Sequence, residues 1–278
     1  MPPAAAGRKP VPREKTAAVA AAEKKPEIYM TRKYSEFIIA ALSYVFGGAS
    51  LLIFAFFLWA GNFKLVDFGW SEGKTLIFNA GLSLAFFIQH SVMVRPSFKQ
   101  RLSKLIPNAQ HGALYSIISG LFLFIVVIFW QAAAPLWEAQ GLARLLLRLF
   151  FILPIIGFFL AVKSLGFFDP FGIKEIFEHY CNANKHPVEF IVKGPYRLVR
   201  HPVYLFVLIM IWSCPYLSAD RLLFNIMWSV WIIVGAFLEE KDLISQFGDT
   251  YRKYQKSVPM LLPYKGIFTG QKLSTLNK

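Results

Sequence analysis

The chain has 278 residues, of which 56% are hydrophobic and 17% aromatic, and its formal net charge is +14 at pH 7. Soluble domains average about 45–50% apolar residues, so this composition argues against a soluble globular protein and for a membrane protein. The basic residues are not gathered in one patch, so the charge gives no reason to expect nucleic-acid binding. The two cysteines, Cys181 and Cys214, have no motif spacing, which excludes a disulfide framework and a cysteine-rich metal site.

The N-terminal segment is rich in Ala, Pro and Lys and lacks the apolar core of a secretory signal. We predict that residues 1–33 form a disordered, basic, cytosolic tail. No internal repeat or Gly-rich linker divides the rest of the chain. A single membrane domain is therefore expected over residues 34–265, followed by a C-terminal tail over 266–278.

Apolar segments long enough to cross a bilayer as helices follow the tail. Four such spans are predicted, at residues 37–60, 75–94, 112–134 and 145–168. The polar residues inside them must face protein or a water-filled cavity, because lipid offers no hydrogen-bonding partners.

The pattern changes after residue 168, where charged residues, Gly, Pro and His mix. A short amphipathic helix is expected at 172–179, then a structured cytoplasmic loop. A helical hairpin follows, with arms at 203–217 and 222–238, of which the first is short for a full span. Residues 238–259 have the periodicity of a cytoplasmic amphipathic helix. The expected fold is thus an all-α integral membrane protein of about six helices: four spans, a C-terminal hairpin and then this amphipathic helix.

The distribution of basic residues sets the expected orientation. If the first span starts inside, all but five of the 30 Lys and Arg fall in cytoplasmic segments, as the positive-inside rule requires. Both termini are then cytoplasmic. The five that fall on the opposite side are Lys64, Lys74, Arg144, Arg148 and Arg221.

No GxGxxG motif opens a strand-to-helix turn, so a soluble Rossmann site for a nucleoside cofactor is excluded. The candidate cradle is GPYRLVRHPVYL at residues 194–205, together with the EE pair at 239–240 and FGDTYRKY at 247–254. By composition alone, the first of these segments is equally a membrane-entry loop, with Arg197 and Arg200 as interfacial anchors.

The same strings, followed by VPMLLP, resemble the cofactor-binding signature of the isoprenylcysteine carboxyl methyltransferases and phospholipid N-methyltransferases. Sterol reductases of that superfamily share a related pattern but hold NADPH. With FFIQHSVMVRPSFKQRL at 86–102 and FFDPFGIKEIF at 167–177, the chain resembles the methanethiol S-methyltransferases, whose wider relatives include NnrU-type proteins and nurim. The resemblance implies S-adenosylmethionine as cofactor and a small thiol as substrate, giving a thioether such as dimethyl sulfide.

The resemblance also implies roles for individual residues. Arg200 is a candidate catalytic residue, and Arg197 or Arg200 would supply charge to the cofactor's carboxylate. The expected cofactor contacts are Tyr196, Arg197, His201, Tyr204, Glu239, Glu240 and Tyr251. Asp169 would help to shape the acceptor side.

Thiolate, not thiol, is the attacking species, so deprotonation needs help. His90 is the candidate base, because imidazole titrates in the useful range, and Gln89 beside it is a candidate substrate contact. A histidine bonded only to a neighbouring helix is the alternative. The grouping of Glu178, His179, Cys181 and His186 matches no zinc spacing, so no metal is expected.

Three other functions stay open at this point. The chain could methylate a lipidic acceptor, such as a prenylcysteine carboxylate or a phospholipid amine. It could be an NADPH-dependent reductase, or a nurim-like membrane protein without enzymatic activity. Partners other than the thiol and the bilayer are not indicated, and the oligomeric state is not encoded in any recognisable pattern.

Overall fold

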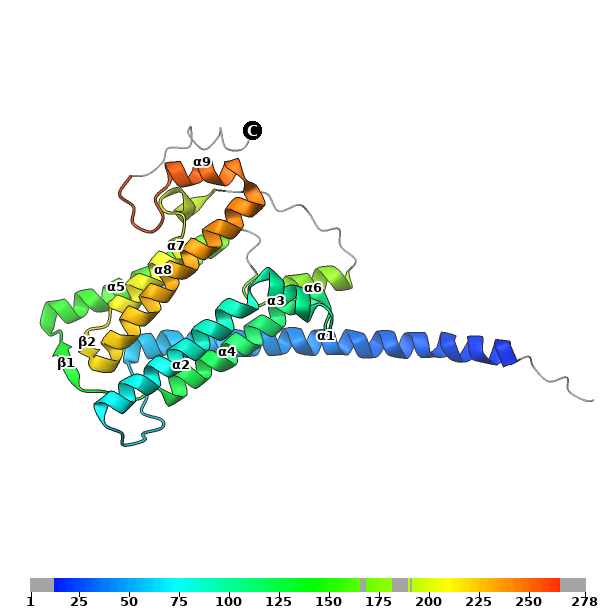
Figure 1. Cartoon of the computed structure of the whole chain (residues 1–278), viewed down its shortest axis with the longest axis horizontal. Helices are drawn as coiled ribbons and strands as arrows, with labels where there is room; N and C mark the ends of the chain where they lie inside the picture. The colour runs from blue at the N-terminus through cyan, green and yellow to red at the C-terminus, as the bar shows by residue number, and fades with distance from the viewer. Residues whose placement is uncertain (1–12, 166–168, 182–189, 191, 266–278) are drawn as a thin grey trace, which may run out of the picture.

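The computed structural model describes residues 13–165, 169–181, 190 and 192–265. The first twelve residues, His186 and the expected C-terminal tail at 266–278 lie outside this part of the chain. The described part is a bundle of helices with one very small sheet (Figure 1). The helices are α1 (Arg13–Ala60), α2 (Glu72–Met93), α3 (Pro96–Leu102), α4 (His111–Phe129), α5 (Gly141–Leu165), α6 (Ile173–Tyr180), α7 (Pro202–Trp212), α8 (Ala219–Phe247) and α9 (Asp249–Ser257). Two 3-10 turns, η1 (Asn108–Gln110) and η2 (Gly194–Arg197), and two strands, β1 (Pro135–Glu138) and β2 (Tyr216–Ser218), complete them.

The expected all-α membrane fold is confirmed. Among the described residues, five helices are long and apolar enough to cross a membrane. Four correspond to the predicted spans, and the fifth is α8, the second arm of the predicted hairpin. The first arm, α7, has only 11 residues, too few for a full span at 1.5 Å per residue. It lies mainly against α5.

Helix boundaries differ from the sequence-based expectation near both ends of the chain. The first helix begins at Arg13, inside the segment expected as a tail, and the Ala, Glu and Lys there are strong helix formers. The expected amphipathic helix at 238–259 is divided between the end of α8 and α9. Gly248 separates them with φ 57° and ψ −130°, a conformation open essentially to glycine alone. The chain can therefore turn sharply at this residue.

The third predicted span stops early, at Phe129 instead of residue 134, for a visible reason. The Gln131 amide donates to Asn79 Oδ1 at 2.9 Å, and the Ala133 amide donates to Asp220 Oδ1 at 2.9 Å. These side chains replace the helical carbonyl acceptors. Beyond this point β1 pairs antiparallel with β2, a sheet that the sequence analysis did not predict.

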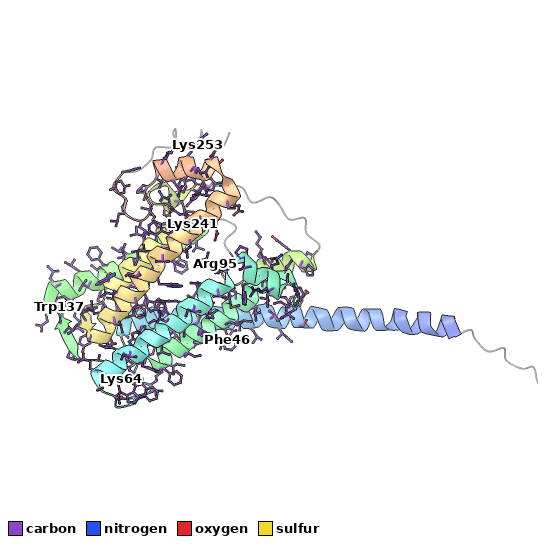
Figure 2. All side chains as sticks on the ribbon, in the orientation of Figure 1. Phe46, Lys64, Arg95, Trp137, Lys241 and Lys253 are labelled. Atoms are coloured by element: carbon purple, nitrogen blue, oxygen red, sulfur yellow. The ribbon has the colours of Figure 1, made fainter. Side chains whose placement is uncertain are left out.

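Basic residues lie at both ends of the bundle but concentrate at one. Figure 2 shows Arg95, Lys241 and Lys253 at one end, and Lys64 and Trp137 at the other. Arg95 approaches Asp242 at 3.7 Å, which ties the end of α2 to α8 on the basic side. The C-terminal ends of α2 and α8 therefore lie at the same end of the bundle, as the charge pattern predicts.

The core of the bundle is aromatic. Phe54 of α1, Phe86 and Phe87 of α2, and Trp228 of α8 pack with ring centroids 5.0–5.3 Å apart around Trp228. All four are buried. Trp228 also donates its Nε1–H to Ser83 Oγ at 3.3 Å. This contact fixes α2 against α8 and thereby places the last turns of both helices beside each other at the basic end.

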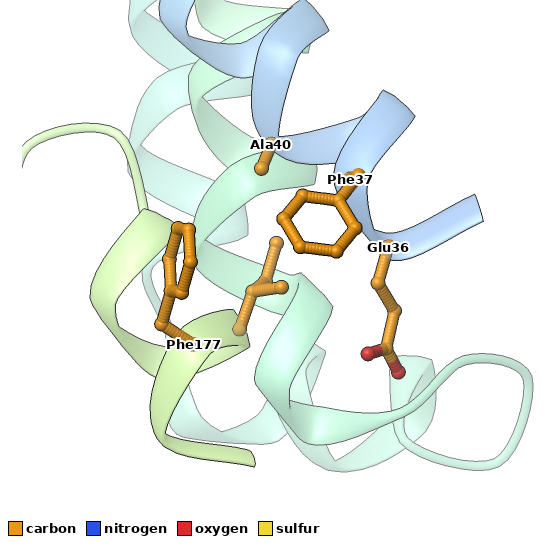
Figure 3. Close-up of a pocket in the computed structure, with 5 residues that line it drawn as sticks. Glu36, Phe37, Ala40 and Phe177 are labelled. Carbon is orange, nitrogen blue, oxygen red and sulfur yellow. The ribbon is translucent and has the colours of Figure 1, made fainter. Parts of the chain in front are cut away.

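The amphipathic helix α6 lies on the first span, as Figure 3 shows for its contact with α1. Phe177 meets Phe37 edge-on, with centroids 5.9 Å apart. Ile176 is buried against Ala40. A pocket lies between these side chains and Glu36, and the residues that line it are separate from the segment at 194–205.

Candidate functional site

The loop before α7 is joined to the chain after α9 by its backbone. The Arg200 amide donates to the Pro259 carbonyl at 2.9 Å, and the His201 amide donates to the Met260 carbonyl at 3.1 Å. Pro202 then begins α7 at a position where its missing N–H is no loss. The RHP string thus turns the chain from this pairing into a helix, and the side chains of Arg200, His201 and Tyr204 bond to α8.

Glu240 of α8 is the centre of a polar network. Its Oε1 accepts from Arg200 Nε at 2.5 Å and lies 3.1 Å from His201 Nε2. Its Oε2 accepts from Gln255 Nε2 at 2.8 Å. The side chain of Glu240 is only 9% exposed and that of Arg200 only 11%. Arg200 Nη1 donates to the carbonyls of Gln255 and Val258 at 2.9 and 2.6 Å.

The adjacent carboxylate is arranged differently. Glu239 accepts one hydrogen bond, from the Tyr204 hydroxyl at 2.7 Å, and 46% of its side chain is exposed. Tyr204 in turn stacks on His201, with centroids 5.3 Å apart and the rings 4° from parallel. A carboxylate can accept about four hydrogen bonds. Glu239 can therefore bind a further donor, whereas Glu240 is already bonded on both oxygens.

The stripe predicted along the C-terminal helix is present in spite of the break at Gly248. Tyr251, Tyr254 and Val258 are buried together, and Phe190 packs on both tyrosine rings. The Tyr254 hydroxyl donates to the Tyr196 carbonyl at 2.6 Å. Burial raises the pKa of the Tyr196, Tyr251 and Tyr254 hydroxyls above the usual value, so these groups stay neutral at physiological pH. These contacts hold α9 against the segment at residues 194–201.

The structure separates two of the expected site residues from this network. Arg197, at the end of η2, is exposed. Asp169 accepts from the Lys174 amide at 2.7 Å and so caps α6, on the side of the bundle where α6 packs against α1 and α4. Capping of α6 therefore explains the presence of a carboxylate at position 169 without any contact to a substrate.

His90 and Gln89 lie at the interface between α2 and α4. The Tyr115 hydroxyl of α4 is 2.6 Å from His90 Nε2 and 3.1 Å from Nδ1. Gln89 Nε2 donates to Ser119 Oγ at 3.2 Å. Tyr115, Ser119 and Gln255 were not among the predicted site residues. Tyr115 and Ser119 are four residues apart in the mostly apolar helix α4, so they share one face, and this spacing was a usable signal.

The side chains of the candidate site suit an organic cofactor better than a metal ion. Among the residues that the structure describes, no group of three or more His, Cys, Asp or Glu side chains is close enough together to hold a metal ion. The cradle offers one open carboxylate and two aromatic side chains, Tyr196 and Tyr204. Carboxylates accept from hydroxyl and ammonium groups, and aromatic faces attract cations. This set suits a cationic ligand that carries hydroxyl and amino groups.

Comparison with known proteins places the chain in a family. A model of the family described as NnrU protein matches residues 77–241. Methanethiol S-methyltransferase 2 of Bradyrhizobium diazoefficiens is 35% identical over 73% of this chain and 81% of its own length. Methanethiol S-methyltransferase of Pseudomonas deceptionensis is 34% identical over 70% and 75%, and rat nurim is 28% identical over 65% and 72%. No solved structure matches the chain. The chain belongs to the NnrU protein family, and the relatives that it resembles at 34–35% identity are methanethiol S-methyltransferases.

Proposed function

We propose that this chain is a membrane methyltransferase that transfers a methyl group from S-adenosylmethionine to methanethiol, giving dimethyl sulfide. The observation that carries the proposal is the paired carboxylate arrangement on α8: Glu240 is saturated by Arg200, His201 and Gln255, while Glu239 stays open beside Tyr204. The names of the relatives support the reaction and the substrate.

The cofactor is proposed to lie between the RHP loop, the end of α8 and α9. When bound, S-adenosylmethionine supplies an electrophilic methyl group on a sulfonium. Glu239 can accept from its ribose hydroxyls or its amino group. The rings of Tyr196 and Tyr204 provide an aromatic wall, and Arg197, which is exposed next to Tyr196, can meet the carboxylate.

The remaining residues of the network are proposed to hold the cradle in shape. Arg200 joins α8 to the carbonyls of Gln255 and Val258, and Glu240 joins Arg200 to His201. Tyr251 packs behind them with Phe190. Rigid support of this kind matters, because in-line displacement requires donor and acceptor to be collinear within narrow limits.

The protein is proposed to lie with the cradle and both termini on the cytoplasmic side. Arg95, Lys241 and Lys253 at the same end of the bundle support this orientation (Figure 2). Residues 34–265 would form the membrane domain. A membrane-embedded acceptor side suits the chemistry, because a thiolate and a sulfonium neutralise each other, which becomes more favourable as the dielectric constant falls.

Two measurements test the proposal. Detergent-purified protein should bind S-adenosylhomocysteine in isothermal calorimetry, and cells that express the chain and are fed methanethiol should release dimethyl sulfide into the headspace, measured by gas chromatography. An absence of binding by folded protein would exclude every methyltransferase function. Binding without dimethyl sulfide would exclude the thiol and turn attention to a lipidic acceptor.

A further inference from the structure

Tyr115, which contacts the candidate base His90, was not among the predicted site residues. Tyr115 reaches from α4 to His90 on α2, and its hydroxyl lies within hydrogen-bond distance of both imidazole nitrogens, at 2.6 Å from Nε2 and 3.1 Å from Nδ1. Phe86 and Trp231 also pack against the imidazole ring, each with its centroid 5.2 Å away. The Tyr115 hydroxyl thus occupies a position from which a ligand could bond to the His90 nitrogens.

This arrangement decides which group a thiol can reach. A neutral imidazole has one donor nitrogen and one acceptor nitrogen, whereas a tyrosine hydroxyl donates once and accepts twice. When the Tyr115 hydroxyl donates to the acceptor nitrogen of His90, its own lone pairs remain able to accept a proton. A thiol that approached His90 directly would have to displace this hydrogen bond. A thiol that approached Tyr115 would extend it.

A second observation points to a ligand at the same place. Gln89 Oε1 is buried and has no hydrogen-bond partner among the described residues, although the same amide donates to Ser119 Oγ and Met93 Sδ. Ser119 lies one helical turn from Tyr115. A buried acceptor without a partner is rare in folded proteins, and the S–H group of a thiol is a donor that could occupy it.

Tyr115 also interacts electrostatically with Tyr204, which is bonded to Glu239. The Tyr115 hydroxyl is therefore within electrostatic range of the residues proposed to hold the cofactor.

We propose that Tyr115 is a catalytic residue that takes the proton from the thiol, and that His90 is the positioning residue that accepts the proton of the Tyr115 hydroxyl in turn. The inference rests on the proposed function. The S–H bond breaks as an O–H bond forms on Tyr115, and the original tyrosine proton moves to His90, so Tyr115 ends neutral. The electron pair left on the thiol sulfur would form the new bond to the methyl carbon. The bond between that carbon and the sulfonium sulfur would break, and its electrons would stay on the sulfonium sulfur, which leaves as the neutral thioether S-adenosylhomocysteine. His90 then releases its proton to solvent.

The test compares Tyr115→Phe, His90→Ala and the double variant with wild type, from pH 6.5 to 9.5, on methanethiol and on thiophenol. Tyr115→Phe should lower kcat for methanethiol at pH 7 by about 10²–10⁴, the usual range for a positioned acid–base group. The defect should shrink as the pH rises and should be smaller for the more acidic thiophenol, because solvent then supplies the thiolate. The double variant should be no slower than the slower single variant, because the two groups act as a unit.

The control is Ser83→Ala, which removes another hydrogen bond between α2 and a neighbouring helix, the one from Trp228. It should lower the melting temperature in detergent without a pH-dependent loss of kcat. S-Adenosylhomocysteine should bind Tyr115→Phe as tightly as wild type. A loss in Tyr115→Phe that is equal for both thiols at every pH, or wild-type turnover at pH 7, would overturn the role of Tyr115 alone. A wild-type protein that forms no dimethyl sulfide would instead overturn the proposed function, and the relay with it.

Discussion

Alanine substitutions of the two adjacent glutamates of α8 should affect different properties: the substitution of Glu240 should lower stability, and that of Glu239 should lower cofactor affinity. Glu240→Ala removes the shared acceptor of Arg200, His201 and Gln255, whose donors lie 2.5–3.1 Å from its oxygens. Breaking a buried ion pair costs about 3–5 kcal/mol. Because Arg200 keeps two carbonyl partners, we expect about 3 kcal/mol, the lower end. At roughly 2–4 °C per kcal/mol, the melting temperature in detergent should fall by about 6–12 °C.

Glu239→Ala is the matched control, since it removes the same side chain one position earlier. Its side chain is 46% exposed, and among the described residues its carboxylate accepts one hydrogen bond, from Tyr204, with His201 Nδ1 farther away at 3.7 Å. The melting temperature should therefore stay close to that of wild type. Its affinity for S-adenosylhomocysteine, measured by calorimetry, should fall about tenfold, the effect of one lost hydrogen bond to a charged group. The reasoning is refuted if Glu240→Ala melts like wild type, or if Glu239→Ala melts early and still binds normally.

Two further predictions concern α9. Gly248→Ala forces an alanine to adopt φ 57° and ψ −130°, which costs about 1–3 kcal/mol. Both the melting temperature and the affinity for S-adenosylhomocysteine should therefore fall. An unchanged variant would mean that the protein does not need this backbone conformation between α8 and α9. Burial raises the pKa of the Tyr196, Tyr251 and Tyr254 hydroxyls in the folded protein, whereas a tyrosine in the unfolded chain ionises at about pH 10. Below about pH 10 these buried tyrosines therefore contribute fully to stability. Above it the unfolded chain loses protons first, so this contribution is lost as the pH rises. The melting temperature should therefore decline above about pH 10, and Tyr254→Phe should melt lower at pH 7 but decline less steeply; equal slopes would contradict a buried Tyr254.

The helical spans could be predicted because lipid imposes one simple requirement, a long apolar helix. The same reasoning could not place the end of α4, which depends on Asn79 and Asp220 meeting backbone amides from distant parts of the chain. The division of the C-terminal helix was visible in principle, since Gly248 stands between two well-formed amphipathic segments. The periodicity runs on across it, however, and so favoured one continuous helix.

The candidate site was predicted from motif resemblance, which groups residues without giving their geometry. Arg200, His201, Tyr204, Glu239 and Glu240 do come together. The different tasks of Glu239 and Glu240 could not be seen, because they depend on which carboxylate Gln255 and Arg200 saturate. The spacing of Tyr115 and Ser119 places them on one helix face, but the contact of Tyr115 with His90 on another helix could not be seen from the sequence.

The central claim is methyl transfer from S-adenosylmethionine to methanethiol, and an isotope experiment tests it most directly. Detergent-purified protein would be incubated with methanethiol and S-adenosylmethionine carrying a trideuterated methyl group, and the headspace analysed by gas chromatography with mass detection. The account predicts dimethyl sulfide with one deuterated methyl group, formed by wild type and strongly reduced in Glu239→Ala at limiting cofactor. Folded wild-type protein that binds S-adenosylhomocysteine but forms no labelled dimethyl sulfide would contradict it.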